Sequence, residues 1–265
     1  MRYPWLAPPL CGLARRVLLA VAAVQGALAA GLTRLGLVRA GDVVRARSLK
    51  LRGIAGWILG IFPWLERHRR FVARAGQGGV DVLFVGDSLT ENWLTDGAVP
   101  WQERLAPLGA ENFGIGGDRT WLVASRLACG ELEGIRPRVV VLLIGANDVR
   151  ANSPEQVAEG IADIIGVIRD RLPSTRTLLL SLLPQDRYET ERRASIARVN
   201  ELIRELHDGE HVIFLEVSGE FLSANGQVSE EIMSDFLHLT PRGYEIFADA
   251  IHPVLVDLLA GAEQR

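Results

Sequence analysis

The chain has 265 residues, of which 48% are hydrophobic, and its formal net charge is only −3. This length and composition are sufficient for one large α/β core with residues to spare. The small net charge gives no electrostatic basis for binding nucleic acid, and two cysteines make neither a disulfide scaffold nor a zinc site.

Charge is distributed unevenly along the chain. Residues 1–75 contain 13 Lys and Arg against two acidic residues, whereas the remainder contains 16 basic and 30 acidic residues. The change of sign falls near the segment RAGQGG (74–79). We therefore divide the chain into an apolar, basic N-terminal extension (residues 1–65) and a main domain (residues 66–265).

The N-terminal extension contains an uncharged run at residues 17–33. Three hypotheses fit this run: a signal peptide, a short membrane anchor, or a helix packed on the main domain. Six basic residues within 34–52 favour keeping that following segment in the cytoplasm. A second apolar run, 54–65, is too short to span a bilayer but long enough to lie in its interface. We favour membrane association in some form, with a membrane or cell-envelope location over a cytoplasmic one, and predict no topology.

Four continuous apolar runs in the main domain predict strands. They are VLFV (82–85), VVVLLI (139–144), LLLSLL (178–183) and VIFLE (212–216). Runs that do not alternate with polar residues are typical of parallel strands covered on both faces.

Helical patterns separate these runs. Residues 152–173 begin with Ser153 and Gln156, which fit a capping box, and then carry a single apolar stripe. A similar apolar stripe occurs in each of two further segments, residues 192–206 and residues 240–259. The alternation of strands and helices predicts a mostly parallel sheet with helices on both faces.

Polar clusters accompany the predicted strands and helices. Ser88 follows the first strand and GAND (145–148) follows the second, while the other two clusters precede helices: NFGIGGDRT (112–120) and SDFLHLT (234–240). Ligands bind at the carboxyl ends of the strands in such sheets, so we expect these clusters to form one site.

The residue types in these clusters fit nucleophilic catalysis. A serine hydroxyl such as that of Ser88 reacts when a base within hydrogen-bond reach takes its proton. Of the five histidines, His238 lies in one of these polar clusters, and Asp235 stands three positions before it in a predicted turn. The resulting oxyanion needs preorganised donors. The backbone N–H groups of Ser88 and Gly117 and the side-chain amide of Asn147 are the candidates.

The four motifs resemble the blocks of the SGNH, or GDSL, hydrolases. They are GDSL (86–89), Gly117 within NFGIGGD, GAND (145–148) and DFLH (235–238). The stretch from residue 68 to 254 resembles the branch of this family that is similar to platelet-activating-factor acetylhydrolase. The resemblance implies a three-layer α/β/α, flavodoxin-like fold and does not extend to residues 1–65, which we predict to add a helical extension.

The resemblance also implies an activity and a set of site residues. It implies a serine esterase whose triad is Ser88, His238 and Asp235, with Ser88, Gly117 and Asn147 forming the oxyanion hole. The implied substrate is a small short-chain acyl ester, with acetyl esters of lipids or sugars foremost. Proton transfer by His238 and charge stabilisation by amide donors need no metal ion, so we predict neither a metal nor another cofactor.

Two segments depart from this branch of the family. PQDRYE (184–189) stands where many relatives have a basic, glycine-containing segment, and TWLVASRL (120–127) has Ser125, not the expected tryptophan, directly before Arg126. We expect both departures to alter the acyl or leaving-group pocket without bearing on the catalytic residues.

Three other functions stay open. The same acyl-enzyme serves acyl transfer to an alcohol, and a noncatalytic ester-binding or carbohydrate-binding module could keep the same fold. A metal-dependent phosphoesterase is the third, although it normally needs more histidine or carboxylate ligands than these motifs offer. The G-x-S-x-G signature of the α/β-hydrolases and the P-loop motif are both absent. The sequence does not define an oligomeric state.

Overall fold

The computed structural model describes residues 63–262, so the predictions for the apolar run at 17–33 lie outside the described residues. The chain divides into two units, Met1–Ala73 and Arg74–Arg265. A helix at residues 63–75 is the first described element. In the described part of the chain, no helix has the length and apolarity needed to cross a bilayer. Membrane association of the extension and its boundary after residue 65 stay predictions.

Five strands in the described part of the chain form one parallel sheet, in the order β2-β1-β3-β4-β5. Their bounds are β1 (Val82–Gly86), β2 (Ala110–Gly114), β3 (Val139–Leu143), β4 (Arg176–Leu180) and β5 (Val212–Leu215). This is the flavodoxin-like strand order, which confirms the expected fold class. The sequence patterns did not predict β2, because Phe113 is its only large apolar residue.

The position of each strand in the sheet decides its burial. Every residue of β1 and β3 is buried, as expected for strands covered on both faces. The same expectation is wrong for β5, where only Val212 is fully buried. Because β5 lies at the edge of the sheet, it has a neighbouring strand on one side only.

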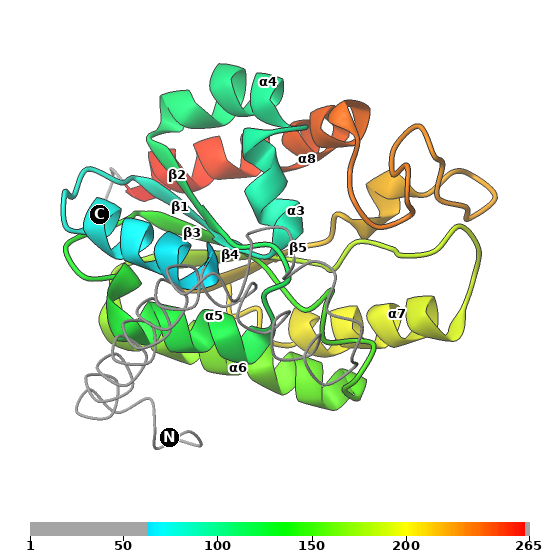
Figure 1. The fold of residues 1–265 in the computed structure, drawn as a ribbon, viewed down its shortest axis with the longest axis horizontal. Helices are drawn as coiled ribbons and strands as arrows, with labels where there is room; N and C mark the ends of the chain where they lie inside the picture. Colours follow the sequence, from blue (N-terminus) through cyan, green and yellow to red (C-terminus); the bar gives the residue numbers. More distant parts are fainter. Residues whose placement is uncertain (1–62, 263–265) are drawn as a thin grey trace, which may run out of the picture. The chain divides into compact units, whose positions relative to one another are not determined.

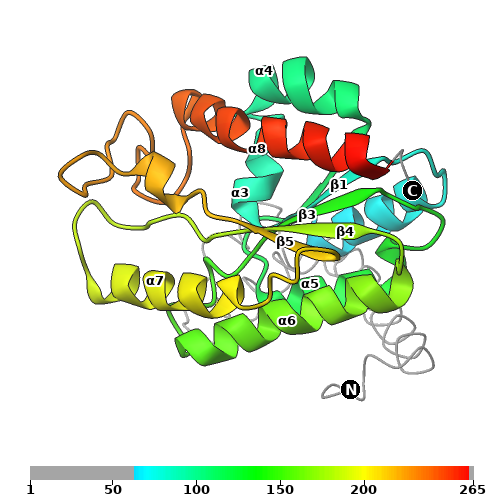
Figure 2. The same ribbon diagram turned by 180° about the vertical axis from the view of Figure 1, so that it is seen from behind.

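Helices cover both faces of the sheet, which gives the predicted three layers (Figures 1 and 2). One face carries α5 (Thr120–Arg126), α6 (Pro154–Arg171) and α7 (Glu191–Arg204), and the other carries α3 (Ser88–Glu91), α4 (Ala98–Pro100) and α8 (Pro241–Ala262). Shorter helical turns complete the connections: η3 (Asn92–Leu94), η4 (Trp101–Leu105), η5 (Ala106–Leu108), η6 (Leu127–Glu131) and η7 (Ser218–Phe221).

The predicted helix starts are confirmed by their capping hydrogen bonds. The Ser153 hydroxyl accepts from the Gln156 N–H at 3.3 Å, and the Gln156 side chain accepts from the Ser153 N–H at 3.0 Å. This reciprocal pair is the capping box that begins α6. At the start of α8, the Thr240 hydroxyl accepts from the Gly243 N–H at 3.2 Å.

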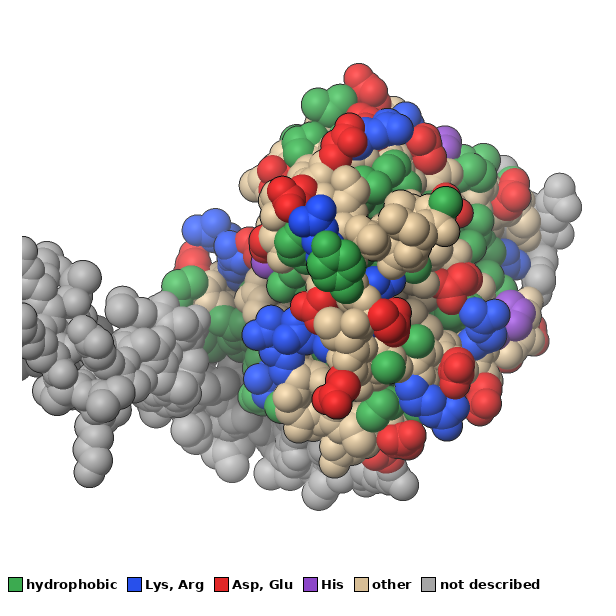
Figure 3. Space-filling view, turned by 90° about the vertical axis from the view of Figure 1, so that its right-hand side faces the viewer, with side chains coloured by type: hydrophobic (Ala, Val, Ile, Leu, Met, Phe, Trp, Pro, Cys, Tyr) green, Lys and Arg blue, Asp and Glu red, His purple; other side chains and the backbone are tan. Residues whose placement is uncertain are grey.

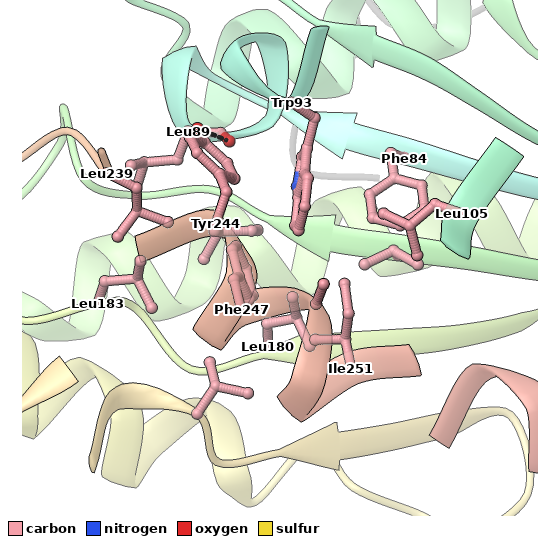
Figure 4. Packing of buried hydrophobic residues seen from close by; sticks show 14 of the residues in the cluster. Phe84, Leu89, Trp93, Leu105, Leu180, Leu183, Leu239, Tyr244, Phe247 and Ile251 are labelled. Carbon is pink, nitrogen blue, oxygen red and sulfur yellow. Dashed lines mark hydrogen bonds between the residues drawn. The ribbon is translucent and has the colours of Figure 1, made fainter. Parts of the chain in front are cut away.

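An aromatic core between the sheet and α8 supports the helix that carries Ser88 (Figure 4). The Trp93 ring is 1% exposed and lies 4.7 Å from the Tyr244 ring and 5.2 Å from the Phe247 ring, measured between centroids. Leu89 of α3 packs in the same cluster, and its burial contributes about 2 kcal/mol. The Tyr244 hydroxyl donates to the Leu89 carbonyl at 2.8 Å, so α8 fixes α3 directly.

Candidate active site

The pairing of β1, β2 and β3 places the starts of three loops next to one another at the carboxyl edge of the sheet. Gly86 at the end of β1 pairs with Gly114 of β2 on one side and with Leu143 of β3 on the other. The chain leaves β1 toward β2 on one side and returns as β3 on the other side, so this edge is the switch point of the sheet. The loops after β1, β2 and β3 therefore begin side by side, as the sequence analysis predicted for Ser88, Gly117 and Asn147.

Ser88 begins α3 directly after a tight strand-to-helix turn. The Asp87 side chain is the N-cap and accepts from the Leu89 N–H at 3.1 Å. A Cβ on Gly86 would lie 2.2 Å from the Leu143 carbonyl oxygen and 2.2 Å from the Thr90 hydroxyl oxygen, so a glycine is required there. This packing explains why the buried strand ends in Gly-Asp-Ser.

The His238 imidazole lies within hydrogen-bond reach of two side chains, with Ser88 at one ring nitrogen and Asp235 at the other. Ser88 Oγ is 3.0 Å from His238 Nε2, and His238 Nδ1 is 2.7 Å from Asp235 Oδ2. Asp235 Oδ1 also accepts from the backbone N–H groups of His238 at 2.7 Å and Leu237 at 3.0 Å. Partial burial raises the pKa of Asp235, but these hydrogen bonds outweigh it and hold the pKa below its usual range. An ionised carboxylate therefore stands beside the imidazole at neutral pH.

Residues 184–189 hold the loop that carries Asp235 and His238. The Phe236 carbonyl accepts from the Asp186 N–H at 3.0 Å. The Arg187 guanidinium carbon lies 5.8 Å from the Phe236 ring centroid. Both contacts are made to Phe236, which lies between the two proposed triad residues, so residues 184–189 support the loop that carries them. The cause is topological, because this segment follows β4 and leaves the same edge of the sheet.

The two other candidate oxyanion donors lie on the neighbouring loops. Gly117 has φ +81°, a backbone conformation that favours glycine, although a Cβ there would meet no atom within 4 Å. The Asn147 amide nitrogen donates to the Asp118 carbonyl at 2.9 Å and to Asp87 Oδ2 at 3.3 Å. Donation from the Asn147 amide to an oxyanion would therefore require the exchange of one of these bonds, and the longer bond to Asp87 is the weaker. The sequence analysis did not anticipate this competition.

A buried ion-pair network lies behind these loops. The Arg126 side chain has no exposed surface and donates to the carboxylates of Asp118, at 2.8 Å, and Glu131. It also donates to the carbonyls of Gly86 at 3.1 Å and Phe113 at 2.7 Å. Arg126 therefore ties the ends of β1 and β2 to the loop that contains Gly117. The sequence analysis missed this role, although an arginine among apolar helix residues is a signal for a buried pair.

Two carboxyl groups in the loops that follow β1 and β3 have shifted pKa values. Burial raises the pKa of Asp87 to about 7, because it outweighs the hydrogen bond from the Leu89 N–H. The nearby charge of Asp118 raises the pKa further. Burial also raises the pKa of Asp148, against the hydrogen bonds from the N–H and hydroxyl of Thr120. The site therefore contains a buried carboxyl group that titrates near neutral pH.

The loops between β5 and α8 project from one side of the main domain (Figure 1), and Figure 3 shows that side. Acidic and basic side chains are interspersed on the visible part of this side, with small apolar groups between them. Within residues 63–262, no three His, Cys, Asp or Glu side chains gather as ligands for a metal ion.

Together, the parallel sheet and the Ser, His and Asp side chains at its carboxyl edge define the class of α/β/α ester hydrolases. A family comparison refines this assignment. The model of the GDSL-like Lipase/Acylhydrolase family matches residues 84–246, so the chain belongs to that family. It is a carboxylic ester hydrolase.

Curated relatives cover most of the main domain. The chain is 40% identical over 198 residues to platelet-activating factor acetylhydrolase IB subunit alpha1 of Pongo abelii, which covers 74% of this chain and 84% of the relative. It is 40% identical over 197 residues to subunit alpha2 of Rattus norvegicus, with 74% and 85% covered. These relatives agree with the branch that the sequence motifs resemble.

Solved structures share the fold. A GDSL-like lipase from Bacteroides thetaiotaomicron has a TM-score of 0.57 at 19% identity, covering 72% of this chain and 97% of that one. An acetylxylan esterase from Geobacillus stearothermophilus has a TM-score of 0.56 at 15% identity, covering 67% and 94%. At these identities the likeness establishes the fold and no more.

Proposed function

We propose that this enzyme hydrolyses short-chain acyl esters, acetyl esters foremost, of a lipid, carbohydrate or small molecule through a serine mechanism. Ser88 is the nucleophile, His238 the general base and Asp235 the residue that orients the imidazole. The observation that supports this most is the pair of contacts at His238, 3.0 Å to Ser88 Oγ and 2.7 Å to Asp235 Oδ2. This is the geometry by which a base activates a hydroxyl.

The proposed reaction has two halves. His238 Nε2 takes the hydroxyl proton as Ser88 Oγ bonds to the ester carbonyl carbon, and the protonated ring then gives that proton to the departing alcohol oxygen. Water next attacks the acyl-enzyme, with His238 as base, and releases the carboxylic acid and the free serine. In each half the carbonyl oxygen becomes negative, and the N–H groups of Ser88 and Gly117 and the Asn147 amide stabilise it.

Two observations support a short acyl group and a neutral ester. The relatives at 40% identity are named as acetylhydrolases, which favours the acetyl group. Charges of both signs are mixed on the side from which the loops before α8 project (Figure 3), so this surface gives no preference for a strongly charged substrate. We propose no particular leaving group.

A panel of p-nitrophenyl esters from acetyl to octanoyl tests this proposal. We expect kcat/KM to be greatest for the acetyl ester and to fall about tenfold or more by the hexanoyl ester, since a short pocket excludes the added methylenes. Equal or greater activity on the long esters would contradict the short-chain assignment.

Two controls on the same panel separate the alternative chemistries. We expect prolonged treatment with a chelator to leave hydrolysis unchanged, and a loss restored by a divalent cation would favour metal-dependent chemistry. Adding a primary alcohol tests acyl transfer, because a transferase would give the new ester as its main product. A binding module would take up the ester without releasing product.

The Asn147→Ala variant tests the oxyanion hole. We expect kcat to fall by about 10²–10³, with KM changed much less, because one donor to the transition state is lost. Asn152→Ala, which removes an exposed amide from the same loop, is the matched control and should behave like wild type. A kcat near wild type for Asn147→Ala would remove this residue from the proposed hole.

A further inference from the structure

The direction of the Gly117 N–H depends on how a turn of two adjacent glycines is held. The Asp118 N–H donates to the Ile115 carbonyl at 3.1 Å, and Gly117 has positive φ whereas Gly116 does not. This is the pattern of a type II turn. The peptide unit between Gly116 and Gly117 is flipped in type II relative to type I, and it carries the proposed oxyanion donor. Two adjacent glycines by themselves favour neither the type I nor the type II turn strongly. Contacts with other residues must therefore fix the orientation of this peptide unit.

Contacts hold the turn at three points. Before it, the Ile115 N–H donates to the last carbonyl of β1 at 3.2 Å. After it, Asp118 is held by its ion pair with the buried Arg126. Within it, the Gly116 N–H donates to Oε2 of Glu91 at 2.6 Å. The third contact acts on the residue next to the proposed oxyanion donor.

Glu91 connects this turn to the nucleophile. It is the last residue of α3, the short helix that Ser88 begins. A Cβ on Gly116 would lie 2.9 Å from Glu91 Oε2 and 3.7 Å from Ser88 Cβ, so the turn packs directly against this helix. A carboxylate that accepts from a backbone N–H makes a bond about twice as strong as a neutral pair. Nucleophile and turn are thereby held as one unit.

We propose that Glu91 is a positioning residue of the oxyanion hole. By accepting from the Gly116 N–H, it fixes the turn so that the Gly117 N–H faces a carbonyl group bound at Ser88. The inference rests on the proposed serine mechanism and adds to it a residue that acts through the turn. None of the four sequence motifs singled out this glutamate.

The test compares three variants of the full chain. We expect Glu91→Ala to lower kcat about 10- to 100-fold with KM changed less than threefold, because the misdirected donor serves the transition state. Glu91→Gln keeps an acceptor oxygen and should return kcat to within about threefold of wild type. Glu103→Ala, at an exposed position, removes the same charge and should leave kcat unchanged.

A tetrahedral mimic supplies a second readout. Methylboronic acid bonds to the serine oxygen and directs a negative oxygen into the hole, so its Ki should rise in Glu91→Ala by the same factor as kcat falls. A role in stability alone would lower the melting temperature without this matched change. Should Glu91→Ala fail to fold, Glu91→Asp, whose carboxylate is one methylene shorter, should show the parallel loss instead.

The outcomes separate this inference from the proposed function. If Ser88→Ala is inactive while Glu91→Ala retains kcat and Ki within twofold of wild type, the positioning role is overturned and the serine mechanism stands. Equal losses in Glu91→Ala and Glu91→Gln would also overturn it, because the acceptor oxygen would then be irrelevant. If Ser88→Ala keeps full turnover, the proposed function itself fails.

Discussion

Ser88→Ala is expected to lower kcat on the acetyl ester by about 10⁴-fold or more, and His238→Ala to lower it by a similar factor. The alanine at position 88 has no oxygen to form the acyl-enzyme. An alanine at position 238 leaves the serine hydroxyl without a base, and the hydroxyl is then a poor nucleophile. The measurement is single-turnover and steady-state hydrolysis of p-nitrophenyl acetate by each variant.

The double variant makes this prediction sharper. Because the two residues act as a unit, Ser88→Ala combined with His238→Ala should be no slower than either single variant. His252→Ala, on α8, is the matched histidine control and should retain wild-type turnover. Turnover above about a tenth of wild type in Ser88→Ala, with folding intact, would refute the covalent mechanism.

Local chemistry explains which parts of the site were predictable. Asp235 and His238 are three residues apart, so their pairing follows from a single turn. Ser88 and His238 are 150 residues apart, and their contact depends on the strand order of the sheet. The end of a continuous apolar run placed Ser88 at the carboxyl edge of the sheet, whereas His238 follows no strand directly and was proposed from its spacing to Asp235 and from the motif it belongs to.

The parts that were missed depend on pairing between elements. Strand β2 was missed because AENFG lacks the apolar run that located its neighbours. The contacts of Arg126 and Glu91 were missed because a charged side chain is expected to face solvent unless its partner is known. The two bonds of the Asn147 amide, to Asp87 and to the Asp118 carbonyl, join three separate loops. Such contacts are fixed by tertiary packing rather than by any local pattern.

Asp87 is expected to make the folded state less stable as the pH rises from about 4 to about 7. Its pKa is about 7 in the folded protein, against an ordinary value of 3.8. Between these values the folded state binds more protons than the unfolded state, so the free energy of unfolding falls as pH increases. A shift of this size corresponds to about 4 kcal/mol once the pH exceeds 7.

The comparison of wild type with Asp87→Asn isolates this contribution. Asparagine keeps the oxygen that caps α3 and does not ionise, so other titrating groups cancel in the difference between the two proteins. The amide beside Asn147 adds an offset that does not vary with pH. Relative to wild type, Asp87→Asn should therefore become more stable between pH 4 and pH 8, by up to about 4 kcal/mol in urea unfolding.

The control for this pH dependence is an exposed carboxylate. Asp257→Asn, on the surface of α8, should differ from wild type by a small amount that is the same at both pH values. A constant difference for Asp87→Asn as well would mean that Asp87 ionises in the folded state as readily as in the unfolded chain. A difference in the free energy of unfolding that grows with pH would instead mean that the enzyme keeps, beside its proposed nucleophile, a carboxylate whose ionisation reduces stability. The bond from Asn147 to that carboxylate gives a physical reason for keeping it, since it holds the amide next to the serine.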